Sequence, residues 1–302
     1  MAKINTAKYV WMDGKIVRWD DAKIHITSHA LHYGSAVFEG IRSYKTGRGV
    51  ALFRIDNHLE RLFHSASVLG IEIKFTMKEV RNAIKKLLMI NKLEDAYIRP
   101  IAYHGYGSIG VYPKNVSSNI AIIALHDYVK AAKPLRLFTS SYTRPSEKST
   151  APGAKISGNY ANSILAMREA REKGYDEALM LDGEGFVSEG PAENVFIIKD
   201  GKLIAPSSRS SLRGFTRDTL LRISAEIGME PIEKKITLKE AMNADEVFFC
   251  GTGAELSPII SIDNKKIGDG KAGKATAMIR DFYFDIVRGK NKKFGKWLAY
   301  ID

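Results

Sequence analysis

The chain has 302 residues, of which 45% are hydrophobic and 26% charged, as in ordinary soluble globular proteins. This length predicts two domains and a sizeable core. The 46 basic and 34 acidic residues give a net charge of +12, and the single cysteine, Cys250, excludes an internal disulfide framework or a cysteine-built metal site. The longest apolar run, Ile120 to Leu125, is too short for a membrane helix, and no signal-peptide pattern opens the chain. We therefore expect a cytoplasmic protein without a membrane partner.

The first fifty residues predict two β-hairpins. Residues 9–12 and 15–19 flank Asp13-Gly14, which is a strong two-residue turn signal. Residues 42–44 and 50–53 are joined by a glycine-containing turn. Between the hairpins lie His25, His29 and His32, but no carboxylate or cysteine ligand accompanies them, so we expect structural histidines and no metal.

A helix is predicted next, with Asp56 or Asn57 as its N-cap and Gly70 beyond its end. Helical spacing gives it a buried stripe of Leu59, Leu62, Ala66 and Leu69. Arg61 lies off this stripe, and such a residue by default faces solvent. A second helix over residues 77–90 and strands over 96–101 and 120–125 complete the first half.

Two glycine-rich stretches imitate nucleotide-binding loops. Gly105 to Gly110 fits G-x-G-x-x-G, but the nine residues 111–119 are too short for the helix that a dinucleotide fold requires before the next strand. Gly268 to Lys274 has Walker A spacing, but Ala275 stands where a Ser or Thr should bind magnesium. We predict that both are turns. A basic nucleotide- or nucleic-acid-binding protein stays a remote alternative, because it rests on these stretches and the dispersed positive charge.

The second half predicts alternating elements. A helix follows Tyr160 as far as about Lys173, and strands are expected over residues 178–181, 185–188, 195–199 and 202–205. Another helix starts at Gly214 to Thr216, with Leu220, Ile223 and Ile227 on one face and Gly228 past its end. A final helix covers residues 276–287.

The chemistry centres on two stretches, residues 154–160 and 188–196. In the first, Lys155 ends a Pro/Gly-rich loop and Tyr160 follows as the helix begins. In the second, Glu189 lies among small residues that allow a ligand close to the backbone. A lysine, a phenol and a carboxylate are the groups that pyridoxal phosphate needs for its carbonyl, ring hydroxyl and pyridine nitrogen. By composition alone, Lys155 would be an ordinary surface lysine.

Seven segments in order resemble fold-type IV pyridoxal-phosphate aminotransferases, and among them most closely the branched-chain amino acid aminotransferases. They are residues 28–34, 37–42, 58–62, 97–100, the lysine and glutamate stretches taken together, 212–217 and 251–255. The resemblance implies an α+β fold of two domains with the cofactor between them. We expect a small N-terminal domain over 1–124, an interdomain linker over 125–134 and a large pyridoxal-phosphate-binding domain over 135–302.

The resemblance also assigns the cofactor residues. Lys155 would bond to pyridoxal 5′-phosphate and move the proton, and Glu189 would keep the pyridine nitrogen protonated. Tyr160 would hold the ring oxygen, and Leu212 would pack on the ring. The phosphate would be bound by Arg61, Phe215, Thr216 and Thr252. Glu193 and Asn194 are expected to be structural.

For the substrate, the resemblance implies an apolar pocket for leucine, isoleucine and valine, with Arg99 accepting the side-chain carboxylate of glutamate. The α-carboxylate would lie near Thr252, Gly253 and Ala254. The other substrate-binding positions are Tyr33, Phe38, Gly40, Arg42, Tyr97, Ile109 and Tyr128.

The implied reaction is transamination between branched-chain L-amino acids and 2-oxoglutarate. A homodimer or homohexamer with active sites shared between subunits is expected, with Tyr33 and the loop around Ile109 reaching across, and neither nucleic acid nor membrane as partner. The same fold also supports D-amino-acid and (R)-amine transaminases and aminodeoxychorismate lyases, which differ around Phe38 to Arg42 and Tyr97 to Arg99.

Overall fold

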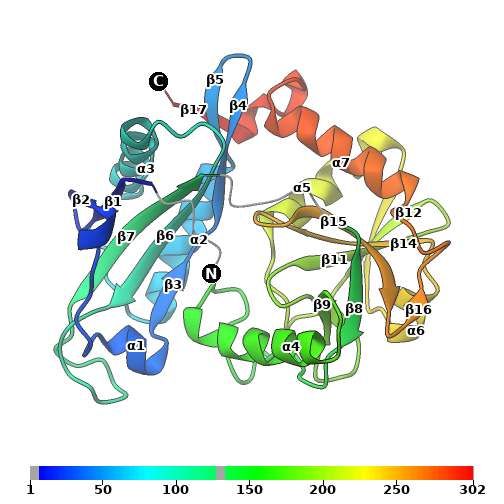
Figure 1. Ribbon diagram of the computed structural model, residues 1–302, viewed down its shortest axis with the longest axis horizontal. Helices are drawn as coiled ribbons and strands as arrows, with labels where there is room; N and C mark the ends of the chain where they lie inside the picture. The colour runs from blue at the N-terminus through cyan, green and yellow to red at the C-terminus, as the bar shows by residue number, and fades with distance from the viewer. Residues whose placement is uncertain (1–6, 127–132, 302) are drawn as a thin grey trace. The chain divides into compact units, whose positions relative to one another are not determined.

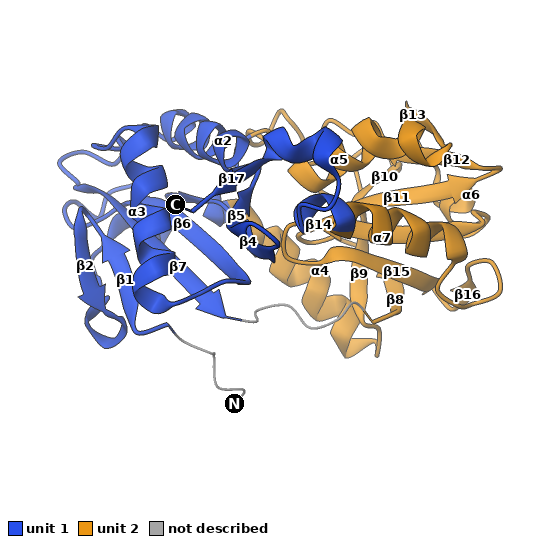
Figure 2. Cartoon of the chain, turned by 90° about the horizontal axis from the view of Figure 1, so that it is seen from above, with its two compact units in different colours: residues 1–130, 154–158, 285–302 blue, residues 131–153, 159–284 orange. Residues whose placement is uncertain are grey.

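The computed structural model describes residues 7–126 and 133–301, which form both helices and strands (Figure 1). These group into two compact units, coloured separately in Figure 2. Unit 1 holds residues 1–130, 154–158 and 285–302, and unit 2 holds residues 131–153 and 159–284. Helices and sheets in two units match the expected α+β class. The borders expected at residues 124 and 135 stay a prediction, and residues 127–132 of the expected linker lie outside the described residues.

Unit 1 contains one sheet, which has eight strands among the described residues. They are β1 (Tyr9–Met12), β2 (Lys15–Arg18), β3 (Ala36–Phe38), β4 (Ile41–Thr46), β5 (Gly49–Phe53), β6 (Ala96–His104), β7 (Ser118–His126) and β17 (Leu298–Tyr300). The order is β17-β5-β4-β6-β7-β1-β2, with β3 also on β6, and all these pairs are antiparallel. The first hairpin is confirmed, and its turn residues Asp13 and Gly14 both have positive φ, at 44° and 88°.

Three α-helices of the described residues accompany this sheet: α1 (His29–Tyr33), α2 (Ile55–Val68) and α3 (Met77–Asn91), with short 3-10 turns at Trp19–Asp21 and Lys292–Trp297. Helix α2 buries Leu59, Leu62 and Ala66 as predicted, but Leu69, the fourth residue of the predicted stripe, is the C-cap and is only half-buried. The predicted N-cap, Asp56 or Asn57, is wrong. The N-cap is Arg54, whose φ of 52° turns the chain directly from β5 into the helix. Asp56 therefore falls in the first turn, where its charge favours the helix dipole.

Unit 2 is built on a mixed sheet, which has nine strands among the described residues. They are β8 (Leu135–Thr139), β9 (Glu177–Leu181), β10 (Val187–Glu189), β11 (Asn194–Lys199), β12 (Lys202–Pro206), β13 (Glu230–Lys234), β14 (Glu246–Gly251), β15 (Glu255–Ile262) and β16 (Lys265–Lys266). The order is β10-β9-β8-β15-β14-β11-β12-β13, with β16 on β15. Strand β10 also pairs with β11 through Glu189 and Asn194, which closes six of these strands into a ring.

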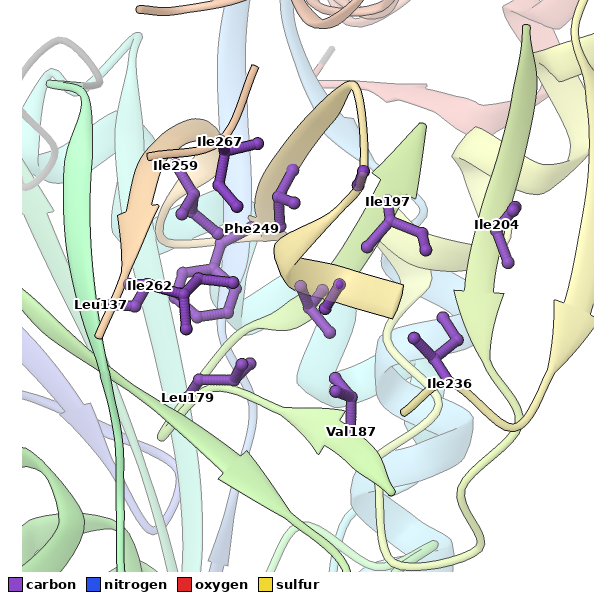
Figure 3. Close-up of a cluster of buried hydrophobic side chains, with 14 residues drawn as sticks. Leu137, Leu179, Val187, Ile197, Ile204, Ile236, Phe249, Ile259, Ile262 and Ile267 are labelled. Atoms are coloured by element: carbon purple, nitrogen blue, oxygen red, sulfur yellow. The ribbon is translucent and has the colours of Figure 1, made fainter. Parts of the chain in front are cut away.

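The core of unit 2 follows the two-residue period of its strands. Leu179 points into a large cluster with Val187, Ile197 and Phe249, drawn in Figure 3. The neighbouring Ala178 and Met180 point to the opposite face and pack on helix α4 (Tyr160–Glu172). Because side chains alternate across a strand, β9 separates the two apolar layers.

The remaining helices of unit 2 are α5 (Phe215–Ile223), α6 (Leu238–Met242) and α7 (Lys274–Val287), whose last residues, from 285 on, belong to unit 1. One 3-10 turn lies at Ser224–Ile227, and another, at Ser157–Asn159, spans the border between the units in sequence. Leu220 and Ile223 are buried as predicted. The α-helix ends before Ile227, because the last turn tightens into a 3-10 turn that Gly228 closes with a φ of 70°. No helix of the described residues is long and apolar enough to cross a membrane.

The structure explains both glycine-rich stretches. Gly105 to Gly110 lies in the loop that joins β6 to its antiparallel neighbour β7, so no crossover helix follows. Gly268 to Gly273 precedes helix α7, and the carboxylate of Glu246 accepts hydrogen bonds from the backbone N–H groups of Ala275 and Thr276 at 2.9 and 2.7 Å. An internal acid therefore occupies the helix terminus where a nucleotide phosphate would bind.

The three histidines near the N-terminus have protein partners. His29 contacts the Ser35 hydroxyl at 2.7 Å and the Gly110 carbonyl at 2.9 Å. His32 contacts the Ile26 carbonyl at 3.0 Å, and His25 the Thr27 hydroxyl at 2.8 Å. Within residues 7–126 and 133–301 there is no group of three or more His, Cys, Asp or Glu side chains arranged to hold a metal ion.

Candidate active site

Lys155 lies in unit 1, against strand β3 and helix α2. Its backbone N–H donates to the Ser65 hydroxyl at 2.9 Å, and its carbonyl accepts from the Phe38 N–H at 3.1 Å. The following residue, Ile156, forms a β-bridge with Val37. Lys155 Nζ lies 5.0 Å from the centre of the Phe38 ring. The lysine backbone is therefore fixed by two elements, while its amine lies over an aromatic face.

A close approach of two glycines supports the lysine loop. Gly34 ends α1 with a φ of 62°, and its carbonyl accepts from the Gly158 N–H at 3.1 Å. A Cβ at Gly34 would lie only 2.6 Å from Gly158 Cα. Glycine is required here for both the left-handed backbone and the close contact.

Beside the lysine, a fully buried carboxylate links two side chains of α2. Glu39 accepts from Arg61 Nε at 2.5 Å and from Arg61 Nη2 at 2.9 Å, and its Oε2 lies 2.7 Å from His58 Nδ1. Burial alone would raise the pKa of Glu39, but the charge of Arg61 and the hydrogen bonds and charges of both partners lower it to about 2. Burial lowers the pKa of His58 despite its contact with Glu39. A charged residue off the buried stripe of a helix would by default face solvent, but Arg61 does not, because its side chain is only 11% exposed.

The expected substrate residues of unit 1 form a contacting group. Arg99 donates to the Tyr97 hydroxyl at 2.8 Å, and its Cζ lies 4.8 Å from the centre of the Phe38 ring. Arg42 stands opposite Tyr97 in the β4–β6 register. A Cβ at Gly40 would lie 2.4 Å from the Tyr97 hydroxyl oxygen, so a glycine here makes room for that phenol.

Two further expected substrate residues contact each other at the surface. The Tyr33 hydroxyl donates to the Ile109 carbonyl at 2.5 Å. Both side chains are exposed, Tyr33 by 43% and Ile109 by 61%. Tyr128, the other aromatic expected in the pocket, lies outside the described residues.

In unit 2, Glu189 is buried on strand β10 and held by three donors. Arg144 Nη2 lies 2.8 Å from its Oε1, while Asn194 Nδ2 and the Leu212 N–H lie 3.1 and 3.2 Å from Oε2. Asn194 Nδ2 also reaches the Leu212 carbonyl at 2.8 Å. The carboxylate and the loop that carries Leu212 are thereby fixed together. Glu189 ends β10, one residue later than the predicted strand.

The N-terminus of helix α5 supplies the positions expected to bind an anion. Its N-cap, Gly214, has no side chain to cap the first turn, and a Cβ there would lie 2.2 Å from Asn194 Oδ1. Phe215 and Thr216 are the first two helical residues, so their backbone N–H groups belong to the positive end of the helix dipole. The same unit holds Tyr160, the first residue of α4, and Thr252, Gly253 and Ala254, in the turn between β14 and β15.

Comparison with known proteins identifies the family. A family model described as amino-transferase class IV matches residues 36–262. The chain belongs to the class IV aminotransferases. It is 41% identical to a branched-chain-amino-acid aminotransferase of Pseudomonas aeruginosa over 297 residues, covering 97% of both chains, and 38% identical to that of Escherichia coli K12, covering 98% of both.

Solved structures agree with this assignment. A branched-chain amino acid aminotransferase solved in complex with N-(5′-phosphopyridoxyl)-L-glutamate is 40% identical, with a TM-score of 0.94 over 99% of this chain and 100% of that one. An enzyme from Thermoproteus uzoniensis, solved with norvaline, is 38% identical, with a TM-score of 0.92 over 98% and 100%. The expected two-domain fold of this aminotransferase family is confirmed.

The residues of the aminotransferase fit pyridoxal phosphate in kind. Unit 1 offers an amine and a buried guanidinium, and unit 2 offers a buried carboxylate and a helix N-terminus without a capping side chain. Residue patterns alone did not single out Glu39, Ser65 or Arg144, which contact expected site residues, or His58, which contacts Glu39. Glu39 and His58 do occur inside the segments that carry the family resemblance, and this was the available signal.

Proposed function

We propose that the chain transfers the amino group between the branched-chain L-amino acids leucine, isoleucine and valine and 2-oxoglutarate, with pyridoxal 5′-phosphate as cofactor. The observation that carries the substrate class is the packing of the Arg99 guanidinium 4.8 Å from the centre of the Phe38 ring, next to Tyr97. Aromatic walls accept an aliphatic side chain, and a guanidinium pairs with the second carboxylate of 2-oxoglutarate. The branched-chain names of the relatives described above support the same substrate class.

Within this proposal, each expected cofactor residue has a role of its own. The cofactor, when bound, acts as an electron sink for the substrate carbon that loses its proton. Lys155 would hold the cofactor through its Nζ, and the same amine would move the substrate proton. Glu189 would keep the pyridine nitrogen protonated, Tyr160 would hold the ring oxygen, and Leu212 would pack on the ring.

The anionic groups of cofactor and substrate are assigned to positive sites. Arg61, Thr252 and the first N–H groups of α5, at Phe215 and Thr216, bind the phosphate. The substrate α-carboxylate lies near the backbone of Thr252, Gly253 and Ala254. Gly40 and Arg42 complete the pocket wall with Phe38 and Tyr97.

We also propose a homo-oligomer, a dimer or a hexamer, in which Tyr33 and the loop around Ile109 complete the site of a neighbouring subunit. Exposed apolar side chains around α1 and the β6–β7 loop support a second copy as the occupant of this face. They include Ile26, Leu31, Ile109, Val111 and Tyr112, which are 56–79% exposed. Tyr33 joins the two segments through its hydrogen bond to Ile109. Light scattering on the purified holoenzyme tests this, and a monomer would contradict it. A cytoplasmic location is part of the same proposal.

The reaction is tested by incubating the holoenzyme with L-leucine and 2-oxoglutarate and measuring glutamate. We expect comparable turnover with L-isoleucine and L-valine, and little with D-amino acids, (R)-1-phenylethylamine or aminodeoxychorismate. Turnover of any of these last three that is faster than turnover of L-leucine would contradict the proposed substrate class.

A further inference from the structure

Glu39 is a buried charge for which the proposed reaction has no assigned role. It lies between β3 and β4, and its backbone N–H donates to the Pro100 carbonyl at 2.9 Å, so its main chain is tied to β6. Its side chain has no exposed surface. Removing a carboxylate from water is costly unless charged partners compensate, and here Arg61 and His58 contact both carboxylate oxygens.

The geometry of the ion pair fixes the guanidinium. Arg61 uses Nε and Nη2, which form one fork of the planar group, for the two oxygens of Glu39. A two-point contact sets the plane of the guanidinium and therefore the direction of its other edge, which carries Nη1. An arginine otherwise loses rotamer entropy when it is ordered on a ligand. Ordering it beforehand lowers that cost.

Helix α2 connects this pair to the lysine. His58, Arg61 and Ser65 are spaced at i, i+3 and i+7, so they share one face of the helix. His58 contacts Glu39 and Ser65 accepts from the Lys155 N–H, so this face contacts both the carboxylate and the lysine backbone. The arrangement sets the lysine and the guanidinium in one rigid block of unit 1.

We propose that Glu39 is a positioning residue, which orients Arg61 to bind the cofactor phosphate, with His58 holding the second carboxylate oxygen. This inference rests on the proposed function, because it takes the phosphate of pyridoxal phosphate as the ligand of Arg61. Glu39 itself contacts neither the reacting atoms nor, as an anion, the phosphate.

A purely electrostatic role for Glu39 makes the opposite prediction. An anion beside Arg61 repels a phosphate, so removing its charge in Glu39→Gln would tighten phosphate binding if charge alone mattered. If orientation matters, Glu39→Gln weakens binding, because the amide offers only one acceptor oxygen to the fork. Glu39→Asp keeps the charge but shortens the side chain, and orientation again predicts weaker binding where charge alone predicts no change.

The test measures binding of pyridoxamine 5′-phosphate and of pyridoxamine to apoenzyme by fluorescence titration. Neither ligand has the aldehyde that reacts with Lys155, so the dissociation constant of pyridoxamine divided by that of pyridoxamine 5′-phosphate reports how much the phosphate site strengthens binding. We expect Glu39→Gln and Glu39→Asp each to reduce this ratio by at least about tenfold, or about 1.4 kcal/mol. Glu60→Gln, an exposed carboxylate next to Arg61 on the same helix, is the matched control and should leave the ratio unchanged.

A second comparison separates positioning from general loss of structure. In an Arg61→Ala background, Glu39→Asp should change the phosphate ratio by less than about twofold, because the residue through which Glu39 acts is gone. An unchanged ratio in both single variants would overturn the inference. Tighter binding of pyridoxamine 5′-phosphate by Glu39→Gln, relative to pyridoxamine, would overturn it as well. A wild-type enzyme that bound both ligands equally would instead contradict the proposed cofactor site.

Discussion

Gly34 and Gly158 meet with their backbones in direct contact, the Gly158 N–H donating to the Gly34 carbonyl at 3.1 Å. This contact holds the loop that presents Lys155. We predict that Gly34→Ala lowers the free energy of unfolding by about 1–2 kcal/mol from its left-handed backbone, and by about 1–3 kcal/mol more from overpacking. Chemical denaturation of the variant measures the sum.

Gly70→Ala is the matched control for this prediction. Gly70 has a φ of 67°, close to the 62° of Gly34, but a Cβ there would meet no atom within 4 Å. It should therefore show only the backbone cost and no loss of turnover. Equal destabilisation by both variants would mean that the contact with Gly158 contributes nothing.

The second prediction concerns the two carboxylates of the glutamate stretch. Glu189 is buried among Arg144, Asn194 and the Leu212 N–H, whereas Glu193 accepts from the Ala192 N–H at 3.1 Å. We expect Glu189→Gln to lower kcat by about 10²–10³-fold, the typical effect of removing a preorganised electrostatic partner. Glu193→Gln should lower it by less than about tenfold. A larger loss of kcat in the Glu193 variant would mean that Glu193, and not Glu189, is the electrostatic partner of the cofactor.

The raised pKa of Glu177 predicts that the stability of the fold depends on pH. Burial, together with the nearby charge of Glu193, raises the pKa of Glu177 from 4.5 to about 8. The folded protein then holds a proton that the unfolded chain releases, so this group contributes stability below pH 4.5 that is lost as pH rises towards 8. The loss approaches about 1.4 kcal/mol per pH unit within this window.

Thermal unfolding of Glu177→Gln across pH 5 to 9 checks this sign. The neutral amide cannot release a proton, so the melting temperature of the variant should fall less with rising pH than that of the wild type. Glu60→Gln, which changes an exposed side chain, should follow the wild type. A variant with the wild-type slope would show that Glu177 titrates normally.

Arg99 is expected to separate the two half-reactions. Its guanidinium would pair with the second carboxylate of 2-oxoglutarate, and truncating one partner of such a desolvated pair costs about 2–5 kcal/mol. Leucine makes no such bond. Arg99→Ala should lower the specificity constant for 2-oxoglutarate by about 30-fold or more, with a much smaller effect on leucine. Single-turnover kinetics of each half-reaction measures both, and equal losses would assign Arg99 to the fold or the α-carboxylate.

Local sequence signals predicted most elements of the fold. Asp13-Gly14 forms its hairpin turn, and the spacing of Leu59, Leu62 and Ala66 marks the buried face of α2. These signals work because they depend on neighbours in the chain. The position of Arg61 could not be derived this way, since its partner Glu39 is 22 residues away in sequence, in the connection between β3 and β4.

The candidate site shows the same limit. Lysine, tyrosine and glutamate stretches pointed to pyridoxal-phosphate chemistry only through their resemblance to a family. The contacts that fix them, such as Ser65 with Lys155 and Arg144 with Glu189, join segments up to 90 residues apart. Periodicity treats a charged side chain as exposed, so it cannot identify a buried one whose partner comes from a distant element.

The attachment of the cofactor to Lys155 tests the account most directly. Purified protein should be yellow, and borohydride reduction followed by proteolysis and mass spectrometry should place the pyridoxyl group on the peptide that contains Lys155. Lys155→Ala should lose nearly all turnover and take up no borohydride-fixed label. A colourless protein, or a label on any other lysine, would contradict the assignment of Lys155 and the mechanism built on it.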